Sequence, residues 1–138
     1  MARTGLLSDS DWKELAGQLD ESGYARFPLL APAECAELAG LYRKPGCFRK
    51  RIVMEQHRFG AGEYQYFAYP LPALVRALRT ELYAGLAPIA NAWSQRLGSR
   101  ARYPESHAAF LERCRQRSQT PPPPLLLQPR AQALRRRR

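Results

Sequence analysis

The chain has 138 residues, of which 45% are hydrophobic and 25% charged, and its formal net charge is +10. This length and apolar content fit one domain with its own core and exclude a chain that is disordered throughout. Charged residues or prolines interrupt every apolar stretch well short of the roughly 20 residues that span a bilayer, and the N-terminus lacks the apolar run of a secretory signal. We therefore expect a cytoplasmic protein with no membrane partner.

The positive charge is concentrated at one end of the sequence. The last segment, QPRAQALRRRR, begins at Gln128 and holds five arginines and no acidic residue, so about half of the net charge lies there. Arginines in such a tail bind any polyanion through counterion release and do not select a sequence. The remaining charge, about +5 over residues 1–127, is compatible with nucleic acid but is also common on solvated surfaces.

Two helices are predicted near the start of the chain. Ser8 and Asp11 have the spacing of a capping box, and apolar residues at helical spacing follow until Gly23, which should end a short helix. Pro32 suits the first turn of a second helix, whose apolar positions continue until residues 44–46.

Extended segments are predicted between and after these helices. Residues 24–30 form a brief extended stretch that Pro28 confines to a sheet edge or a strand end. Residues 48–55 and 63–69 have the aromatic and β-branched content of strands, and the glycine-rich residues 60–62 between them indicate a turn. The second and third of these segments should pair as a β-hairpin.

The longest helix should begin at Pro72 and end at Gly98, because leucines, valine, isoleucine and tryptophan recur at helical spacing between them. Gly85 and Pro88 interrupt that pattern, so we expect a kink or a short break there.

A last helix is expected from Pro104. Its apolar residues should face the core; these are Phe110, Leu111 and Cys114. Its arginines should face water; these are Arg113, Arg115 and Arg117. Residues 120–124 are a polyproline spacer. Residues 125–127, three leucines, look like the first residues of a buried strand that has no visible continuation, and we expect it to have no partner strand.

Few residues in the chain suit catalysis or metal binding. Neither His57 nor His107 has an acidic residue two positions later, so the His-x-Asp pair of a facial iron site cannot be assembled. No nucleophile elbow or phosphate-binding glycine loop is present, and the three cysteines are too widely spaced for paired zinc ligands or a disulfide framework. They are better explained as buried or half-buried thiols. Glu55 and Glu63 are most simply polar residues at strand ends.

The best binding candidate is a basic group in the predicted hairpin. Its members, which we treat as candidate nucleic-acid or anion contacts, are Arg49, Lys50, Arg51, His57 and Arg58. Aromatic residues lie among them in the sequence, a combination that suits phosphate contacts together with base stacking. The alternative is a hairpin with one packed aromatic face and one solvated basic face.

Several stretches of the sequence resemble a known family. They are FRKRIVMEQHRFGAGEYQYFAYPLP, the later APIANAW and SQTPPPPLLL, and the preceding GYARFPLLAPAECAELAGLY. Together, over about residues 8–127, they are similar to bacterial 2-oxoglutarate and Fe(II)-dependent oxygenases associated with oxidative removal of alkyl lesions from DNA. The resemblance implies an α+β fold: a helical support layer with a small hairpin, the N-terminal part of an incomplete double-stranded β-helix (jelly roll).

In that family the iron ligands and the arginine that holds 2-oxoglutarate follow the leucine-rich strand, and no position here matches them. We therefore name no catalytic, metal or cofactor-binding residue and expect the chain alone to bind neither Fe(II) nor 2-oxoglutarate. Residues 1–127 would be the N-terminal portion of an oxygenase domain and residues 128–138 a basic, disordered tail, read out of frame in a truncated gene product.

Two other hypotheses remain open from the sequence. The chain could be a small basic module that binds nucleic acid in its own right, with DNA as its partner. It could also be an interaction subunit whose missing C-terminal half is supplied by a separate chain.

Overall fold

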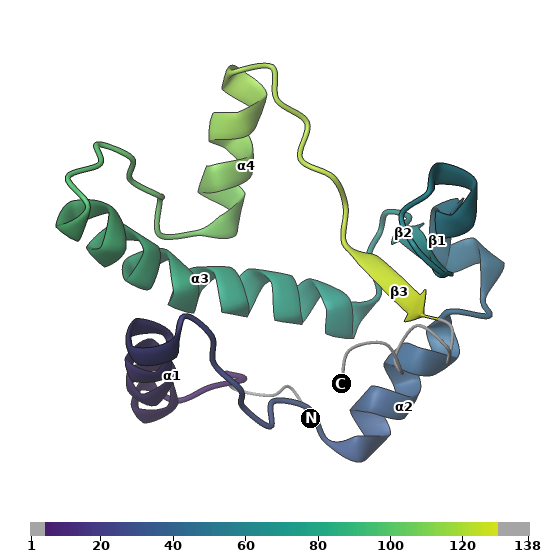
Figure 1. The fold of residues 1–138 in the computed structure, drawn as a ribbon, viewed down its shortest axis with the longest axis horizontal. Helices are drawn as coiled ribbons and strands as arrows, with labels where there is room; N and C mark the ends of the chain where they lie inside the picture. Colours follow the sequence, from purple (N-terminus) through teal and green to yellow (C-terminus); the bar gives the residue numbers. More distant parts are fainter. Residues whose placement is uncertain (1–4, 130–138) are drawn as a thin grey trace. The chain divides into compact units, whose positions relative to one another are not determined.

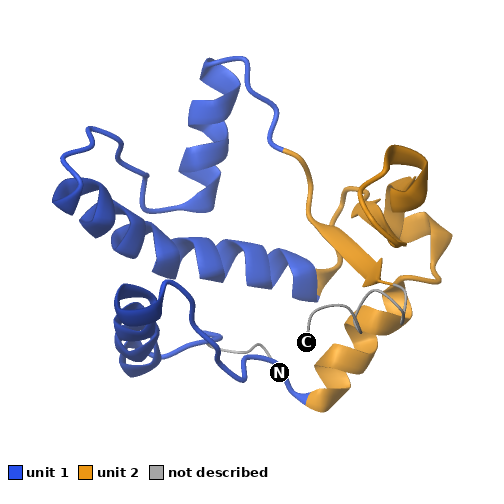
Figure 2. Ribbon diagram, in the orientation of Figure 1, with its two compact units in different colours: residues 1–31, 74–121 blue, residues 32–73, 122–138 orange. Residues whose placement is uncertain are grey.

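The computed structural model describes residues 5–129. They form four α-helices, two short 3-10 helices and one three-stranded antiparallel sheet, so the α+β class is confirmed (Figure 1). The chain divides into two compact units (Figure 2): unit 1 comprises Met1–Ala31 and Leu74–Pro121, and unit 2 comprises Pro32–Ala73 and Pro122–Arg138. Within the described range, no helix is both long enough and apolar enough to cross a membrane.

Helix α1 (Asp9–Ser22) has the two ends that the sequence predicts. The Asp11 amide donates to Ser8 Oγ at 3.2 Å, and the Ser8 amide donates to the Asp11 carboxylate at 2.9 Å, which completes the capping box. Gly23 takes a left-handed conformation with φ of 76° and donates its amide to the Leu19 carbonyl. That conformation favours glycine, so the helix ends there.

The prediction of an extended strand after α1 is wrong. Residues 24–30 belong to neither a helix nor a strand, and no strand of the described chain pairs with them. One anchor is the Arg26 amide, which donates to the Gln18 side chain at 3.1 Å. Because Pro28 has no amide hydrogen, this stretch cannot form a complete ladder of hydrogen bonds with a neighbouring strand.

Helix α3 (Ala73–Arg96) is the central element of unit 1, and it runs through the positions where a break was expected. Gly85 has a packing role instead, because a Cβ atom built there would lie 2.0 Å from the ring of Trp12. The missing side chain lets the indole of α1 lie directly on the backbone of α3. Pro88 is accommodated inside the same helix.

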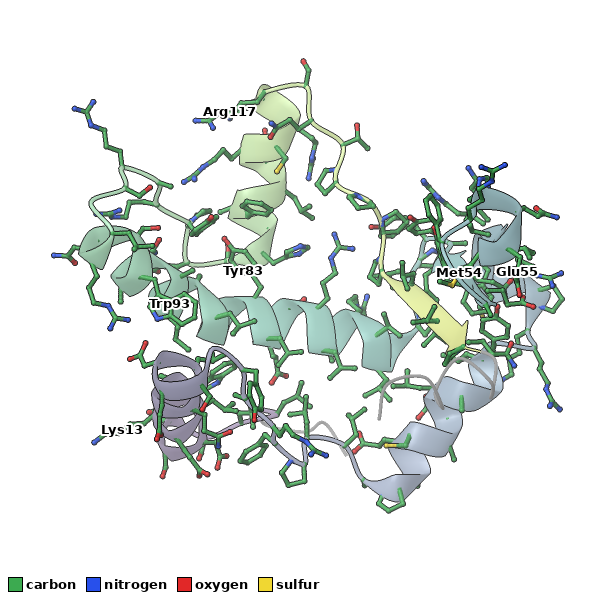
Figure 3. All side chains as sticks on the ribbon, viewed as in Figure 1. Lys13, Met54, Glu55, Tyr83, Trp93 and Arg117 are labelled. Atoms are coloured by element: carbon green, nitrogen blue, oxygen red, sulfur yellow. The ribbon has the colours of Figure 1, made fainter. Side chains whose placement is uncertain are left out.

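A polar contact also joins α1 to the other end of α3. The Asp20 carboxylate accepts from the Trp93 indole at 2.6 Å and from the Arg96 guanidinium at 2.8 Å. These hydrogen bonds hold the pKa of Asp20 below its usual value. Figure 3 shows Trp93 on the side of α3 that faces α1.

Helix α4 (His107–Gln116) begins later than expected, because Ser106 rather than Pro104 caps it. The Ser106 hydroxyl accepts from the Ala109 amide at 3.1 Å. Cys114 is buried, as predicted, and Phe110 is half-buried with its ring centroid 5.5 Å from that of Tyr83 in α3. Helices α3 and α4 are thus joined by aromatic contacts.

Unit 2 consists of α2 (Pro32–Leu41) and the sheet. The three strands are β1 (Phe48–Val53), β2 (Gly62–Phe67) and β3 (Leu125–Pro129), in the order β1-β2-β3, and both pairings are antiparallel. The β1-β2 pair confirms the predicted hairpin. Its connection contains a 3-10 turn, Met54–His57, where the first strand was expected to continue.

The leucine strand differs from its prediction in two respects. It has a partner, since β3 pairs along β2, and the Phe67 amide donates to the Pro124 carbonyl at 2.9 Å just before the strand begins. It is also not buried, because Leu125 and Leu127 are 43% and 55% exposed. The sequence showed an apolar run but could not show that β2 has an edge available for it.

The structure also places the three cysteines and the start of the predicted tail. Cys114 is buried and Cys47 half-buried, as expected, whereas Cys35 is exposed, and all three are free thiols. Of the predicted tail, Gln128 and Pro129 lie in β3, and residues 130–138 lie outside the described range.

The contact between Trp12 and Gly85 can be tested by adding one methyl group. We expect Gly85→Ala to lower the free energy of unfolding by about 1–3 kcal/mol, because the indole must move from the α3 backbone. The matched control is Gly17→Ala in α1, where a Cβ meets nothing within 4 Å. That change should raise stability by about 0.5–1 kcal/mol. Thermal unfolding followed by circular dichroism distinguishes the two, and equal stabilisation of both variants would contradict the packing role.

Candidate nucleic-acid interface

The register of the sheet places its side chains on two different faces. Residues opposite each other in adjacent strands share a face, and neighbours along a strand alternate. We call one side the tyrosine face; it holds Lys50, Ile52, Tyr64, Tyr66, Leu125 and Leu127. The other side, the glutamate face, holds Arg51, Val53, Glu63, Gln65, Phe67, Leu126 and Gln128.

This arrangement divides the predicted basic group. Lys50 lies opposite Tyr66 on the tyrosine face, whereas Arg51 lies opposite Gln65 on the glutamate face. Arg49 falls at the register shift between Phe48 and Lys50. Arg49, Lys50 and Arg51 are all exposed. The three consecutive cations therefore do not form one patch.

Glu63 holds the arginine of the glutamate face. Its carboxylate accepts from Arg51 Nε at 2.5 Å and from Arg51 Nη2 at 2.8 Å, a two-point ion pair. The same carboxylate accepts from the Tyr42 hydroxyl at 2.7 Å. The Gln65 side-chain amide, through Nε2, donates to the Tyr42 backbone carbonyl at 3.0 Å. These bonds connect the glutamate face to the end of α2.

This environment changes the pKa of the Tyr42 phenol. Partial burial, followed by the hydrogen bond to Glu63 and that group's negative charge, raises the pKa of Tyr42 to about 12. The same carboxylate raises the pKa of Arg51, so this guanidinium stays charged. Its charge is balanced by Glu63, and Arg51 is therefore the member of the basic group least suited to bind an external anion.

The tyrosine face combines aromatic rings with one cation. Tyr64 and Tyr66 meet edge to face, with ring centroids 5.6 Å apart. Burial, followed by the neighbouring Tyr66, raises the pKa of Tyr64. Within the described part of the chain, no acidic side chain pairs with Lys50. A free cation beside aromatic rings is the arrangement that contacts phosphate and stacks on bases.

The remaining two candidates lie at the tip of the hairpin. His57 is exposed and stacks on Phe59, with ring centroids 5.6 Å apart and an angle of 21° between the rings. Arg58 is exposed and takes a left-handed conformation with φ of 59°. The tip is held by the Glu55 carboxylate, which accepts from the Gly62 amide at 3.2 Å. Figure 3 shows Met54 and Glu55 in this part of the sheet unit.

The described residues do not fit a ferrous centre. His57 belongs to unit 2 and His107 to unit 1, where His107 Nε2 accepts from the Arg79 guanidinium at 3.1 Å. Burial, and then the charge of Arg79, lowers the pKa of His107. Over residues 5–129, no three His, Cys, Asp or Glu side chains gather where they could hold a metal ion. We assign no catalytic step to these residues.

The sequence pattern predicts Glu63 only as a polar residue at a strand end, and it does not reveal the bonds of Glu63 to Arg51 and Tyr42. A signal for the bond to Arg51 existed. Once the hairpin register is assumed, Arg51 and Glu63 become diagonal neighbours on one face, and opposite charges at such positions attract each other. The contribution of Tyr42 had no comparable signal, because Tyr42 lies outside the hairpin, in the turn that follows α2.

A comparison with protein-family models identifies one match. Residues 62–134 match a family described as "Oxygenase, catalysing oxidative methylation of damaged DNA". The matched range covers more than half of the chain and continues past Leu127, where the resemblance seen in the sequence alone ended. Neither the curated proteins nor the solved structures contain a match to this chain.

The glutamate-face network can be tested with Glu63→Gln. We expect the pKa of Tyr42 to fall from about 12 toward its ordinary value of about 10, because an amide carries no negative charge. Stability should also fall, because the Arg51 guanidinium and the Tyr42 hydroxyl both lose their charged acceptor. In the native chain, the stabilisation from Tyr42 is fully present below about pH 10, the ordinary tyrosine pKa. It is lost as the pH rises through about 12.

Alkaline titration of phenolate absorbance, repeated in Tyr42→Phe to identify the Tyr42 signal, measures the shift. The matched control is Glu37→Gln, which removes an exposed carboxylate from α2 and should change stability by less than about 0.5 kcal/mol. An unchanged Tyr42 titration in Glu63→Gln would contradict the network.

Proposed function

The chain belongs to the family of oxygenases described as catalysing oxidative methylation of damaged DNA, and we propose that it contributes part of the DNA-binding surface of such an enzyme. The matched range contains β2, α3, α4 and β3. Oxidation of an alkyl lesion, with Fe(II) and 2-oxoglutarate as cofactors, is proposed for the full-length relatives. In them the helices and sheet described here would form the support layer and first strands of a double-stranded β-helix.

The observation that carries this proposal is the division of charge across the sheet. Glu63 balances Arg51, whereas Arg49, Lys50 and Arg58 have no acidic partner among residues 5–129. Lys50 shares its face with two tyrosine rings. Free cations can release counterions from a phosphate backbone, and tyrosines can stack on exposed bases. The hairpin therefore suits single-stranded or unpaired DNA.

A second candidate function follows from the exposed leucines of β3. Leu125 and Leu127 lie on the tyrosine face, on a strand at the edge of the sheet, and large apolar side chains there favour a covering partner. A separate chain that carries the rest of the β-helix would cover them. Copurification of a polypeptide with a His-x-Asp stretch would favour this interaction subunit over a module that binds DNA alone.

DNA binding by the hairpin is tested with the double variant Arg49→Gln and Lys50→Gln. Loss of two phosphate contacts should weaken binding to a single-stranded oligonucleotide with one methylated base. It should also reduce the slope of log K against log salt by about 1.4, at about 0.7 per contact. Fluorescence anisotropy at several salt concentrations measures both.

The matched control is Arg26→Gln with Arg76→Gln, which removes the same charge from exposed positions of unit 1. It should leave the slope unchanged. Equal effects of the two double variants would mean that net charge alone governs binding, and the hairpin would lose its assigned role.

The absence of catalysis by this chain alone is a separate prediction. Incubated with Fe(II), 2-oxoglutarate and a methylated oligonucleotide, the purified chain should form no succinate above the level without protein, because the described residues supply no iron ligand set. Mass spectrometry of succinate checks this. Stoichiometric iron binding with succinate formation would refute the prediction.

The cytoplasmic location expected from the sequence stays a prediction.

A further inference from the structure

Unit 1 contains an arginine-rich pocket outside the hairpin. Its volume is about 480 Å³, within the range of small-molecule sites, and it lies between the loop after α3 and helix α4. The residues that line it and matter here are Arg100, Arg102, Tyr103, Phe110, Arg113 and Arg117. The sequence pattern predicts that Arg113 and Arg117 face water; Arg117 is exposed, whereas Arg113 is half-buried at the pocket. No role for Arg100 or Arg102 is evident in the sequence.

The loop that forms one wall is fixed to α3. The Tyr103 amide donates to the Asn91 side chain at 2.7 Å, and the Asn91 amide group donates back to the Tyr103 carbonyl at 2.9 Å. In the next residue, the Pro104 carbonyl accepts from the Tyr83 hydroxyl at 2.9 Å. A wall held by these bonds presents its side chains in a set arrangement and loses little freedom on binding.

Two of the arginines are also held in place, by backbone carbonyls. Arg102 Nη1 donates to the Ser99 carbonyl at 2.8 Å and to the Ala101 carbonyl at 2.7 Å. Arg113 Nη1 donates to the Arg102 carbonyl. A guanidinium has five N–H donors, so each of these side chains keeps donors for a ligand. The carbonyl contacts orient the cations without neutralising them.

The charge in the pocket is not balanced locally. Of the described residues, no Asp or Glu lines the pocket or forms an ion pair with its four arginines. The nearest acidic residue along α4, Glu112, pairs instead with Arg115 at 3.4 Å. Four guanidinium groups around one cavity repel each other unless an anion lies between them, and a planar guanidinium suits the oxygens of a phosphate.

Aromatic rings supply the other part of the lining. Tyr103 is 40% exposed, and its ring centroid lies 6.4 Å from that of Phe110, which in turn contacts Tyr83. Phe110 thus contacts both Tyr103 and Tyr83, which supports the Tyr103 ring. An exposed, supported ring beside cations can stack on a base whose phosphate the arginines hold. Figure 3 shows Arg117 at the C-terminal end of α4.

We propose that this pocket binds a phosphodiester group of single-stranded DNA, with the adjoining base stacked on Tyr103. The inference rests on the proposed function, because membership of a damaged-DNA family is what selects a nucleic acid among phosphate-bearing ligands. It adds a second contact region to that function, one made by unit 1 and independent of the hairpin.

The test uses the double variant Arg100→Gln and Arg117→Gln. Both side chains are exposed and make no described side-chain bond, so the fold should persist, and circular dichroism verifies this. Affinity for a labelled single-stranded oligonucleotide should fall by about tenfold, and the salt slope by about 1.4. The control, Arg26→Gln with Arg76→Gln, removes the same charge from exposed positions of unit 1 that do not line the pocket, and it should leave the slope unchanged.

Two further measurements identify the ligand. Tyr103→Leu should weaken oligonucleotide binding while Tyr103→Phe retains it, because stacking needs the ring and not the hydroxyl. The thymidine dinucleotide d(TpT), which has one phosphodiester and no terminal phosphate, should shift the arginine side-chain NMR signals of the pocket. Inorganic phosphate at the same concentration should not. Equal shifts with both would identify a free anion as the ligand and overturn the assignment.

The outcomes separate this inference from the proposed function. Loss of binding in the Arg49 and Lys50 variant but not in the pocket variant would overturn the pocket and leave the hairpin proposal intact. Loss in the pocket variant but not in the hairpin variant would support the pocket and overturn the hairpin. No DNA binding by the native chain would overturn both.

Discussion

The carboxylate of Glu63 determines how unit 2 can present charge. It is half-buried on the central strand of the sheet, where it binds Arg51 from β1 and Tyr42 from the end of α2. An unpaired carboxylate in that position would be costly, and an unpaired arginine beside it would add a further cation to the glutamate face. With both satisfied, α2 is fixed to this face, and the free positive charge of the sheet is left to Arg49, Lys50 and Arg58.

In unit 1, small and polar residues let other elements pack closely against α3. Gly85 lets Trp12 lie on the backbone of α3, and Asp20 joins α1 to the far end of the same helix. On another side of α3, Asn91 fixes the loop that precedes α4. The arginines of the pocket are presented by this loop and by α4, so the arrangement of the cations depends on contacts made by uncharged residues.

The two candidate contact regions use the same chemistry with different supports. On the sheet, a lysine shares a face with tyrosines that meet edge to face. In unit 1, four arginines line a pocket together with a tyrosine whose ring contacts Phe110. Phosphate contacts position a nucleic acid, and stacking on rings tolerates any base. Such surfaces suit contact with DNA of varied sequence, which is the partner that we propose for this chain.

The sequence by itself determined the features that depend on local pattern: the capping box at Ser8, the stop at Gly23, the hairpin and the family resemblance, which the match over residues 62–134 confirms. Tertiary structure decided what depends on neighbours far along the chain. Only strand register could separate Lys50 from Arg51, only the return of the chain could pair β3 with β2, and only the packing of α4 against α3 could bring Arg100 to Arg117. Local propensity acts over a few residues, whereas pairing and charge balance depend on groups that the sequence does not place together.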